Sequence, residues 1–138
     1  MVTDKAAVLA VVEASVDGWR QLDADKILST VARRDDVLIW GTDSDEVWVG
    51  FDAFSEAVEE QIGAFENPSY EWESGDPKIW MLGDAALAYG ELRVSIDSAG
   101  QRWHSTMRST FVLQQETTGW LIIHSHYSIG QTERVVDY

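Results

Sequence analysis

Three short turn signals divide the second half of the chain into long segments, and this division constrains the fold more than any other feature of the sequence. The segments cover about residues 69–82, 84–97, 101–115 and 119–129, and the breaks between them are Gly83-Asp84, Ala99-Gly100 and Thr118-Gly119. Short turns rich in Gly and Asp connect neighbouring antiparallel strands. The sequence therefore predicts an antiparallel meander of four long strands.

The first half of the chain is mainly helical. Apolar residues recur at helical spacing from Val8 to Trp19, which predicts an amphipathic helix over 4–22 with Thr3 as its N-cap. The other predicted elements are a short helix over 24–32 with Asp23 as its N-cap, strands at 36–40 and 46–49, and a helix over 51–65 that ends before Pro68. Helices followed by a long sheet indicate one α+β domain over residues 1–138.

The charge balance excludes several classes of partner. The chain holds 10 Lys and Arg against 24 Asp and Glu, a formal charge of −14, so a nucleic acid is not an expected partner. No apolar run is long enough for a membrane span, no signal-peptide pattern is present and there is no Cys, which together favour a cytoplasmic protein. A surface so acidic and so poor in Lys suggests a halophilic source; an ordinary acidic soluble protein is the alternative.

The last predicted strand has two different faces. Side chains two residues apart in a strand point the same way, so Trp120, His124, His126 and Ser128 share one face. We interpret this face as the lining of a partly polar cavity. The opposite face is apolar and predicts a homodimer contact, formed by Leu121, Ile123, Tyr127 and Ile129 with Met107, Phe111 and Leu113 from the preceding strand.

The hairpin turns predict which residues lie side by side. A three-residue loop at 116–118 would place Thr110 opposite His124 and Arg108 opposite His126. A two-residue turn at 99–100 would place Glu91 opposite Arg108 and Tyr89 opposite Thr110. One face would then carry the row Glu91–Arg108–His126 beside the row Tyr89–Thr110–His124, although a change of one residue in either loop would reverse the faces.

These rows predict the polar floor of a pocket. His126 is the candidate acid or base, and Glu91 the candidate base or orienting partner of Arg108, which is suited to grip an anionic or carbonyl oxygen. The expected ligand-binding residues are Arg108, His124, Tyr89, Thr110 and Trp40, the last as a cap over the pocket mouth. The alternative is a purely structural ladder in which buried charges satisfy one another.

A metal site is not expected. His124 and His126 lie two residues apart, but the third histidine, His104, would lie about 13 Å from Arg108 along the strand at ~3.3 Å per residue. The acidic turn at 43–46 lacks the spaced ligands of a calcium loop and is interpreted as a solvated turn. No metal and no cofactor are therefore predicted.

Several short motifs, in the predicted order of elements, resemble one superfamily. They are Trp40-Gly41, Gly50-Phe51-Asp52-Ala53-Phe54, Arg108-Ser109-Thr110, and Trp120 with His124, His126 and Ser128. The chain resembles the nuclear transport factor 2-like superfamily, specifically its SnoaL-like branch, and the last cluster is also similar to the association domain of calcium/calmodulin-dependent protein kinase. The resemblance implies a cone-shaped fold, in which a curved antiparallel sheet wraps around N-terminal helices and encloses a pocket, commonly in a homodimer.

The resemblance does not choose a function. The superfamily includes ketosteroid isomerase, scytalone dehydratase, polyketide cyclases, transport factors and oligomerisation domains, and no catalytic set of these enzymes matches this chain position by position. We expect a protein that binds a small apolar or aromatic ligand carrying an anionic or carbonyl group. It would act, if it is an enzyme, by cofactor-independent proton transfer in an isomerisation, cyclisation or dehydration. The alternative is an oligomerisation or protein-interaction module without catalysis.

Overall fold

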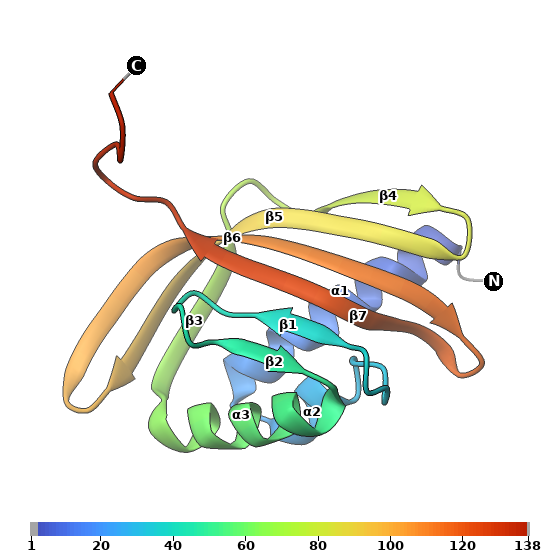
Figure 1. Cartoon of the computed structure of the whole chain (residues 1–138), viewed down its shortest axis with the longest axis horizontal. Coiled ribbons are helices and arrows are strands. Elements are labelled where there is room, and N and C mark those ends of the chain that lie inside the picture. Colours follow the sequence, from blue (N-terminus) through green and yellow to red (C-terminus); the bar gives the residue numbers. More distant parts are fainter. Residues whose placement is uncertain (1–2, 138) are drawn as a thin grey trace.

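The elements follow the order that the sequence predicts, helices first and sheet after. The structure, a computed structural model, describes residues 3–137. Its elements are α1 (Asp4–Gln21), α2 (Ala24–Leu28), β1 (Leu38–Trp40), β2 (Val47–Val49), α3 (Phe51–Ala64), β3 (Glu66–Trp72), β4 (Lys78–Leu82), β5 (Ala85–Ser98), β6 (Gln101–Glu116) and β7 (Gly119–Ile129) (Figure 1). The predicted α+β class is confirmed.

Both predicted helix caps are present. The Thr3 hydroxyl accepts a hydrogen bond from the Ala6 backbone N–H at 3.2 Å. The Asp23 carboxylate accepts one from the Lys26 N–H at 3.1 Å. Each cap satisfies a backbone donor that the first turn of a helix leaves without a partner. The predicted starts of α1 and α2 are therefore correct.

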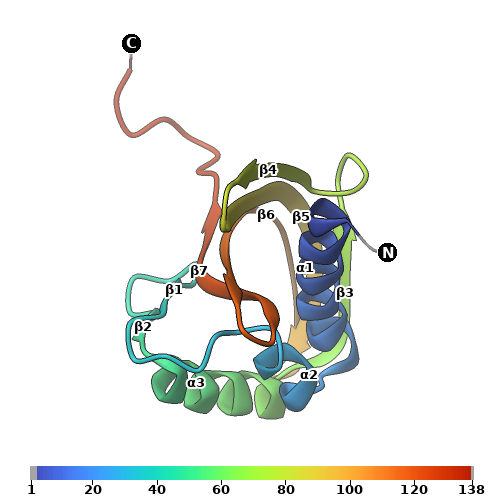
Figure 2. The same cartoon turned by 90° about the vertical axis from the view of Figure 1, so that its right-hand side faces the viewer.

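The strands form one curved sheet in the order β2-β1-β7-β6-β5-β3, with β4 also paired to β5. The sheet curls over α1, while α2 and α3 lie across its open side (Figure 2). All pairs are antiparallel except β1 with β7, which run parallel in the register Leu38↔His124 and Trp40↔His126. The sheet is therefore mixed rather than wholly antiparallel, because β1 pairs with the last strand and not only with its sequence neighbour.

The predicted strand over 69–82 is two strands, β3 and β4. Gly75 lies between them with a φ of 83°, a conformation that residues with a side chain rarely adopt. Pro77 follows and has no N–H for a strand ladder. The chain therefore turns away at 73–77, and both strands pair with different parts of β5.

The predicted register is right for one hairpin and wrong for the other. Between β5 and β6, Glu91 faces Arg108 and Tyr89 faces Thr110, as predicted. Between β6 and β7 the loop is one residue shorter than predicted, since Glu116 pairs with Gly119. A bulge then shifts the register between the pairs Leu113↔Ile122 and Val112↔His124, which leaves Ile123 unpaired.

The two shifts in this hairpin add up to two residues. Arg108 consequently faces Ser128 instead of His126, and Thr110 faces His126 instead of His124. A shift of two keeps these residues on a common face, as predicted. Trp120 precedes the bulge, however, and it is buried in the core on the opposite face.

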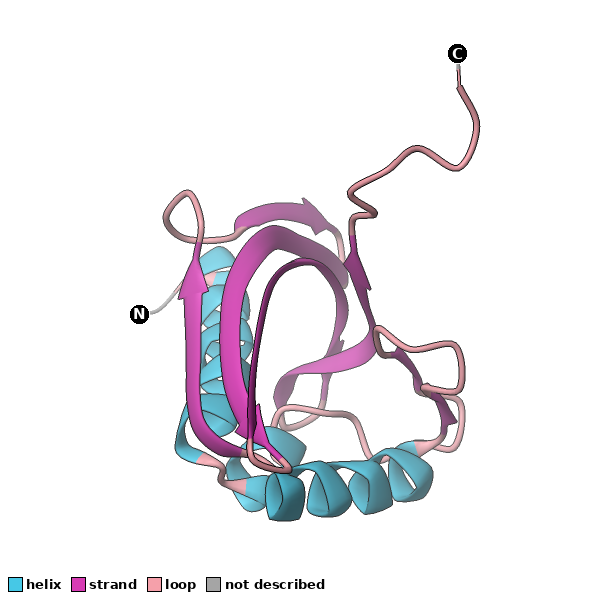
Figure 3. Ribbon diagram, turned by 90° about the vertical axis from the view of Figure 1, so that its left-hand side faces the viewer, coloured by secondary structure: helices cyan, strands magenta, loops and turns pink. Residues whose placement is uncertain are grey.

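The core lies between the concave face of the sheet and the helices (Figure 3). Phe111 and Leu113 are fully buried there against side chains of α1 and α3. The ring of Tyr127 meets Phe111 edge-on at a centroid distance of 5.8 Å. The apolar face on which the dimer contact was predicted is therefore covered by the chain's own helices, and that location of the contact is wrong.

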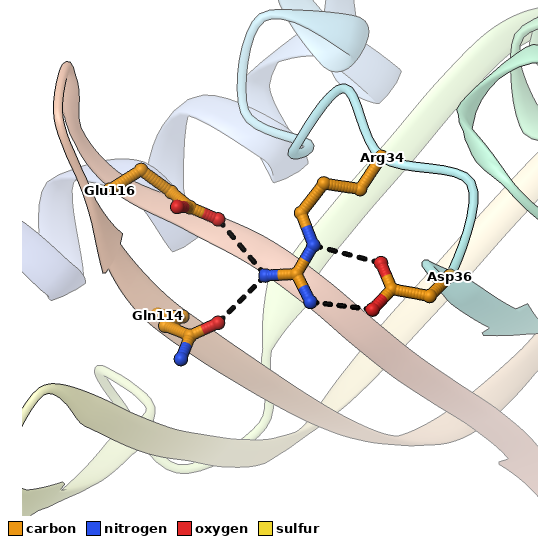
Figure 4. A network of polar contacts seen from close by, with 4 residues as sticks. All are labelled: Arg34, Asp36, Gln114 and Glu116. Atoms are coloured by element: carbon orange, nitrogen blue, oxygen red, sulfur yellow. Dashed lines mark hydrogen bonds and ion pairs between the residues drawn. The ribbon is translucent and has the colours of Figure 1, made fainter.

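One polar network ties the segment before β1 to the end of β6 (Figure 4). The Arg34 guanidinium donates two hydrogen bonds to the Asp36 carboxylate, at 2.8 and 2.6 Å. Its third nitrogen donates to Gln114 Oε1 at 2.7 Å and to Glu116 Oε1 at 3.1 Å. The Arg34 guanidinium holds the pKa of Asp36 below its usual range through these hydrogen bonds.

Within residues 3–137, no helix has both the length and the hydrophobicity that crossing a membrane requires.

Candidate ligand-binding site

The residues predicted to form a polar pocket floor lie on the outer, convex face of the sheet. Glu91, Arg108 and His126 are exposed, whereas their strand neighbours, which point to the other face, are buried: Leu92, Ser109 and Ser125. Tyr89 and Trp40 are 37% and 39% exposed on the same face. Glu91, Arg108, Tyr89 and Thr110 border a shallow depression beside the 74–78 segment, whereas His124, His126 and Trp40 do not line it.

Trp40, His124 and His126 form a separate cluster on this face. The Trp40 ring contacts the His126 ring at a centroid distance of 5.0 Å and the His124 ring at 5.6 Å, both edge-on. His124 Nδ1 lies 2.7 Å from the Leu38 carbonyl oxygen. A carbonyl oxygen only accepts hydrogen bonds, so Nδ1 is the donor in this contact. Among the described residues, no three side chains of His, Cys, Asp or Glu gather as a metal site would require.

The inner face of the sheet encloses a cavity of about 380 Å³. Its size falls within the range of ~300–1,000 Å³ typical of small-molecule sites. Most of the lining is apolar or aromatic, and the lining residues are Trp19, Gly41, Thr42, Asp43, Glu46, Trp48, Phe54, Gln61, Phe65, Tyr70, Leu92, Val94, Ile96, Ser98, Trp103, Met107, Tyr127 and Ile129.

The pleat of β5 explains much of this apolar wall. Alternate side chains of β5 point inward, and Leu92, Val94 and Ile96 are each less than a tenth exposed. Met107 on β6, opposite Leu92, and Tyr127 on β7 continue the wall across the sheet. The same alternation that builds the core therefore also builds the apolar wall of a ring-sized cavity beside it.

Two of the residues that line this wall, Tyr70 and Tyr127, carry a hydroxyl group. Burial raises the pKa of Tyr127 to about 12, while a hydrogen bond with Ser125 acts in the opposite direction. Burial also raises the pKa of Tyr70 above its usual range, and the neighbouring Tyr127 adds to the shift. Both phenols are protonated at physiological pH, as an ordinary tyrosine is, and each hydroxyl can act as a hydrogen-bond donor.

The β1–β2 hairpin forms one edge of the cavity, and the carboxylate of Glu46 lies at this edge. Glu46 Oε1 accepts hydrogen bonds from the Asp43 N–H at 2.8 Å and from the Thr42 hydroxyl at 3.4 Å. Glu46 Oε2 accepts one from Gln61 Nε2 on α3 at 3.1 Å. These three donors fix the carboxylate between the hairpin and α3.

Gly41 permits this position of Glu46. A Cβ atom at Gly41 would lie 2.8 Å from both Cβ and Oε1 of Glu46, closer than such atoms approach in proteins. Only a residue without a side chain lets the carboxylate fold back across the hairpin. The absence of a side chain at Gly41 therefore allows the Glu46 carboxylate to take up its position at the cavity.

Three of the polar groups that line the cavity, those of Tyr127, Glu46 and Tyr70, are not predicted from the sequence. Tyr127 was assigned to an apolar contact, and Glu46 to a solvated turn. Tyr70 was not singled out at all. Tyr127 alone had a detectable signal, a hydroxyl within an otherwise apolar set. The role of Glu46 depends on how the hairpin folds back toward Gln61, which residue spacing does not reveal.

The fold is that of the nuclear transport factor 2-like class. A superfamily protein of that name from Salmonella enterica serovar Typhimurium is similar over 98% of this chain and 97% of its own, with a TM-score of 0.85 at 20% identity. A protein from Xanthomonas campestris named for the calcium/calmodulin-dependent protein kinase II association domain covers 93% of this chain and 89% of its own, with a TM-score of 0.76 at 21% identity. A ketosteroid isomerase-like protein from Erwinia carotovora covers 91% and 95%, with a TM-score of 0.75 at 17% identity. These identities establish the fold and no activity.

Sequence comparison then gives the family. The profile of the SnoaL-like domain matches residues 8–132, and the chain belongs to this family. The predicted resemblance is thus confirmed. No curated protein matches the sequence.

Proposed function

We propose that this protein binds an apolar, ring-containing small molecule with a carbonyl oxygen in the cavity inside the cone. The observation that carries the proposal is the position of two tyrosines, Tyr70 and Tyr127, in the mainly apolar wall of a cavity of about 380 Å³. An apolar wall favours rings by burial, and a phenol donor favours a ligand oxygen that accepts a hydrogen bond. The two carboxylates at the hairpin edge, Asp43 and Glu46, disfavour an anionic ligand at that end.

Proton transfer is the reaction class that this cavity supports. Glu46 is a carboxylate that can accept a proton next to a carbonyl group, and the tyrosine hydroxyls can stabilise the enolate oxygen that forms. No cofactor is needed for that step. His126, the acid or base predicted from the sequence, lies on the opposite face of the sheet and cannot reach a ligand in the cavity.

A matched pair of probes tests the binding proposal. 2-Acetylnaphthalene carries a carbonyl group, and 2-ethylnaphthalene has nearly the same shape without it. Trp19, Trp48 and Trp103 line the cavity, so quenching of tryptophan fluorescence reports binding. The ketone should bind more tightly than the hydrocarbon. Tyr127→Phe should weaken binding of the ketone by about 2- to 10-fold, because one hydrogen bond contributes ~0.5–1.5 kcal/mol. The affinity for the hydrocarbon should not change.

Exchange chemistry tests the reaction class separately. The methyl protons of 2-acetylnaphthalene, next to its carbonyl, should exchange with D₂O faster in the presence of the protein, and Glu46→Gln should abolish the increase. Binding without exchange would leave a ligand-binding protein that is not an enzyme. Absence of binding for both probes, in a folded protein, would contradict the proposal and favour the alternative of an interaction module without catalysis.

A further inference from the structure

The wall of the inner cavity is rich in aromatic rings. The aromatic lining residues are Trp19, Trp48, Phe54, Phe65, Tyr70, Trp103 and Tyr127. The ring of Trp48 packs against Phe54 at a centroid distance of 6.0 Å. The ring of Trp19 packs against Phe65 at 6.5 Å. The faces of such rings carry partial negative charge and attract a cation that comes close to them. An aromatic wall therefore accepts two kinds of group, an uncharged ring and an organic cation.

The charged side chains of the cavity all have one sign. Asp43 and Glu46 line it, and none of the described lining residues is Lys, Arg or His. Among the ion pairs of residues 3–137, none includes Asp43 or Glu46. The two carboxylates thus have no basic partner in the described part of the chain. Their attraction for a cation beside an apolar wall is stronger than it would be in water.

Glu46 can accept a further hydrogen bond. The two oxygens of an ionised carboxylate accept about four hydrogen bonds in all. Among the described residues Glu46 has three donors, the Thr42 hydroxyl and the Asp43 N–H at Oε1 and Gln61 Nε2 at Oε2. The Gln61 amide donates through its nitrogen, so its oxygen is an additional acceptor in the lining. The hairpin edge of the cavity therefore presents acceptors and negative charge, which suit a positively charged donor.

Trp48 supplies an aromatic ring next to this carboxylate. Glu46 directly precedes β2 and Trp48 is the middle residue of β2, so the two residues are two apart in extended chain. Side chains at this spacing point to the same side, and both residues line the cavity. An ammonium group at this position would contact a carboxylate oxygen and an indole ring together. Both contacts favour a cation over a neutral group of the same size.

We infer that the ring-containing ligand of this cavity carries a protonated amine, which is held between the carboxylates of Asp43 and Glu46 and the ring of Trp48. This inference rests on the proposed function, because it requires that the cavity binds a ring-containing ligand. It adds the charge of the ligand and the end of the cavity at which that charge lies. It concerns binding alone and holds whether or not a proton is transferred.

Three naphthalene probes of similar size test the charge preference. 2-(Aminomethyl)naphthalene is a cation at neutral pH, 2-(hydroxymethyl)naphthalene is uncharged and 2-naphthoate is an anion. Isothermal titration calorimetry with the full chain measures the Kd of each. The amine should bind at least ~10-fold more tightly than the alcohol, which is the effect of one hydrogen bond between charged groups. The naphthoate should bind more weakly than the alcohol.

Glu46→Gln removes the charge and keeps the shape of the side chain. In this variant the ratio of the alcohol Kd to the amine Kd should fall close to one, and Asp43→Asn should lower the ratio in part. Glu59→Gln is the matched control, because Glu59 is exposed on α3 and does not line the cavity. It changes the net charge by the same amount and should keep the wild-type ratio. Circular dichroism should show that all three variants remain folded.

The failure of this inference differs from the failure of the proposed function. Binding of the alcohol together with an equal affinity for the amine would overturn the inference and leave the proposed function in place. An amine preference that Glu59→Gln lowers as much as Glu46→Gln does would reflect the overall charge of −14, and it would also overturn the inference. Absence of binding for all three probes, in a folded protein, would contradict the proposed function and the inference with it.

Discussion

Gly18→Ala should destabilise this protein, although alanine is ordinarily preferred to glycine in a helix. Gly18 lies within α1, where the helix propensity of alanine would contribute about 0.5–1 kcal/mol of stability. An added Cβ atom, however, would lie 2.6 Å from Ile27 Cγ1 and 2.9 Å from the Ile27 backbone nitrogen. Ile27 is fully buried and its backbone belongs to α2, so it has little room to shift.

The size of the effect follows from these two opposing contributions. Insertion of a methyl group into a packed site costs about 1–3 kcal/mol, and contact with a backbone atom places this site in the upper part of that range. After subtraction of the propensity gain, the free energy of unfolding should fall by about 1–2 kcal/mol. Urea unfolding followed by tryptophan fluorescence measures it, with all proteins at one concentration.

Gly63→Ala is the matched control. Gly63 also lies in a helix, α3, but an added Cβ atom there would meet nothing within 4 Å. This variant should keep or raise the free energy of unfolding, by up to about 1 kcal/mol. If both variants raise stability alike, the close packing of α1 on α2 at Gly18 is refuted.

Three further predictions concern the cavity hairpin, the network before β1 and a buried hydroxyl. Gly41→Ala should displace Glu46 and lower the Glu46-dependent proton exchange of 2-acetylnaphthalene in D₂O as strongly as Glu46→Gln does, which NMR measures. Exchange at the wild-type rate would show that Gly41 does not position the carboxylate. Asp36 has a lowered pKa in the folded state, so its contribution to stability is present above its unfolded pKa of ~4 and is lost as the pH falls through the lower folded value. Asp36→Asn should accordingly destabilise the protein at pH 6 and lose that effect toward pH 3 in urea unfolding, and a pH-independent difference would contradict this assignment. Ser109→Ala should leave the free energy of unfolding unchanged or raise it by up to about 1–2 kcal/mol, because the buried Oγ has no hydrogen-bond partner among the described residues. Thermal unfolding measures this, and a loss of stability would contradict the prediction.

Helices, turns and the β5–β6 register could be predicted because each depends on local chemistry. Thr3 and Asp23 are capping residues directly before apolar helical repeats, and the Ala99-Gly100 turn fixes the pairing of Glu91 with Arg108. The β6–β7 register depends on whether a loop has two or three residues and on a bulge at Ile123, neither of which has a local sequence signal here.

The candidate site could be predicted only in part, because residue alternation separates two faces without showing which one is inside. The polar set with His126 and Arg108 was placed toward a pocket, and the apolar set with Tyr127 toward a second copy. Which face is covered depends on the direction in which the sheet curls over α1, a property of the whole fold. The halophilic source and the cytoplasmic location stay predictions.

The central proposal is that a ligand binds in the cavity on the inner face of the sheet, and one NMR titration tests it most directly. Adding 2-acetylnaphthalene to isotope-labelled protein should shift the signals of cavity residues such as Leu92, Met107 and Tyr127, and should leave the ring signals of His124 and His126 unchanged. Shifts confined to His126 and Arg108 on the outer face would contradict the assignment of the cavity as the ligand site.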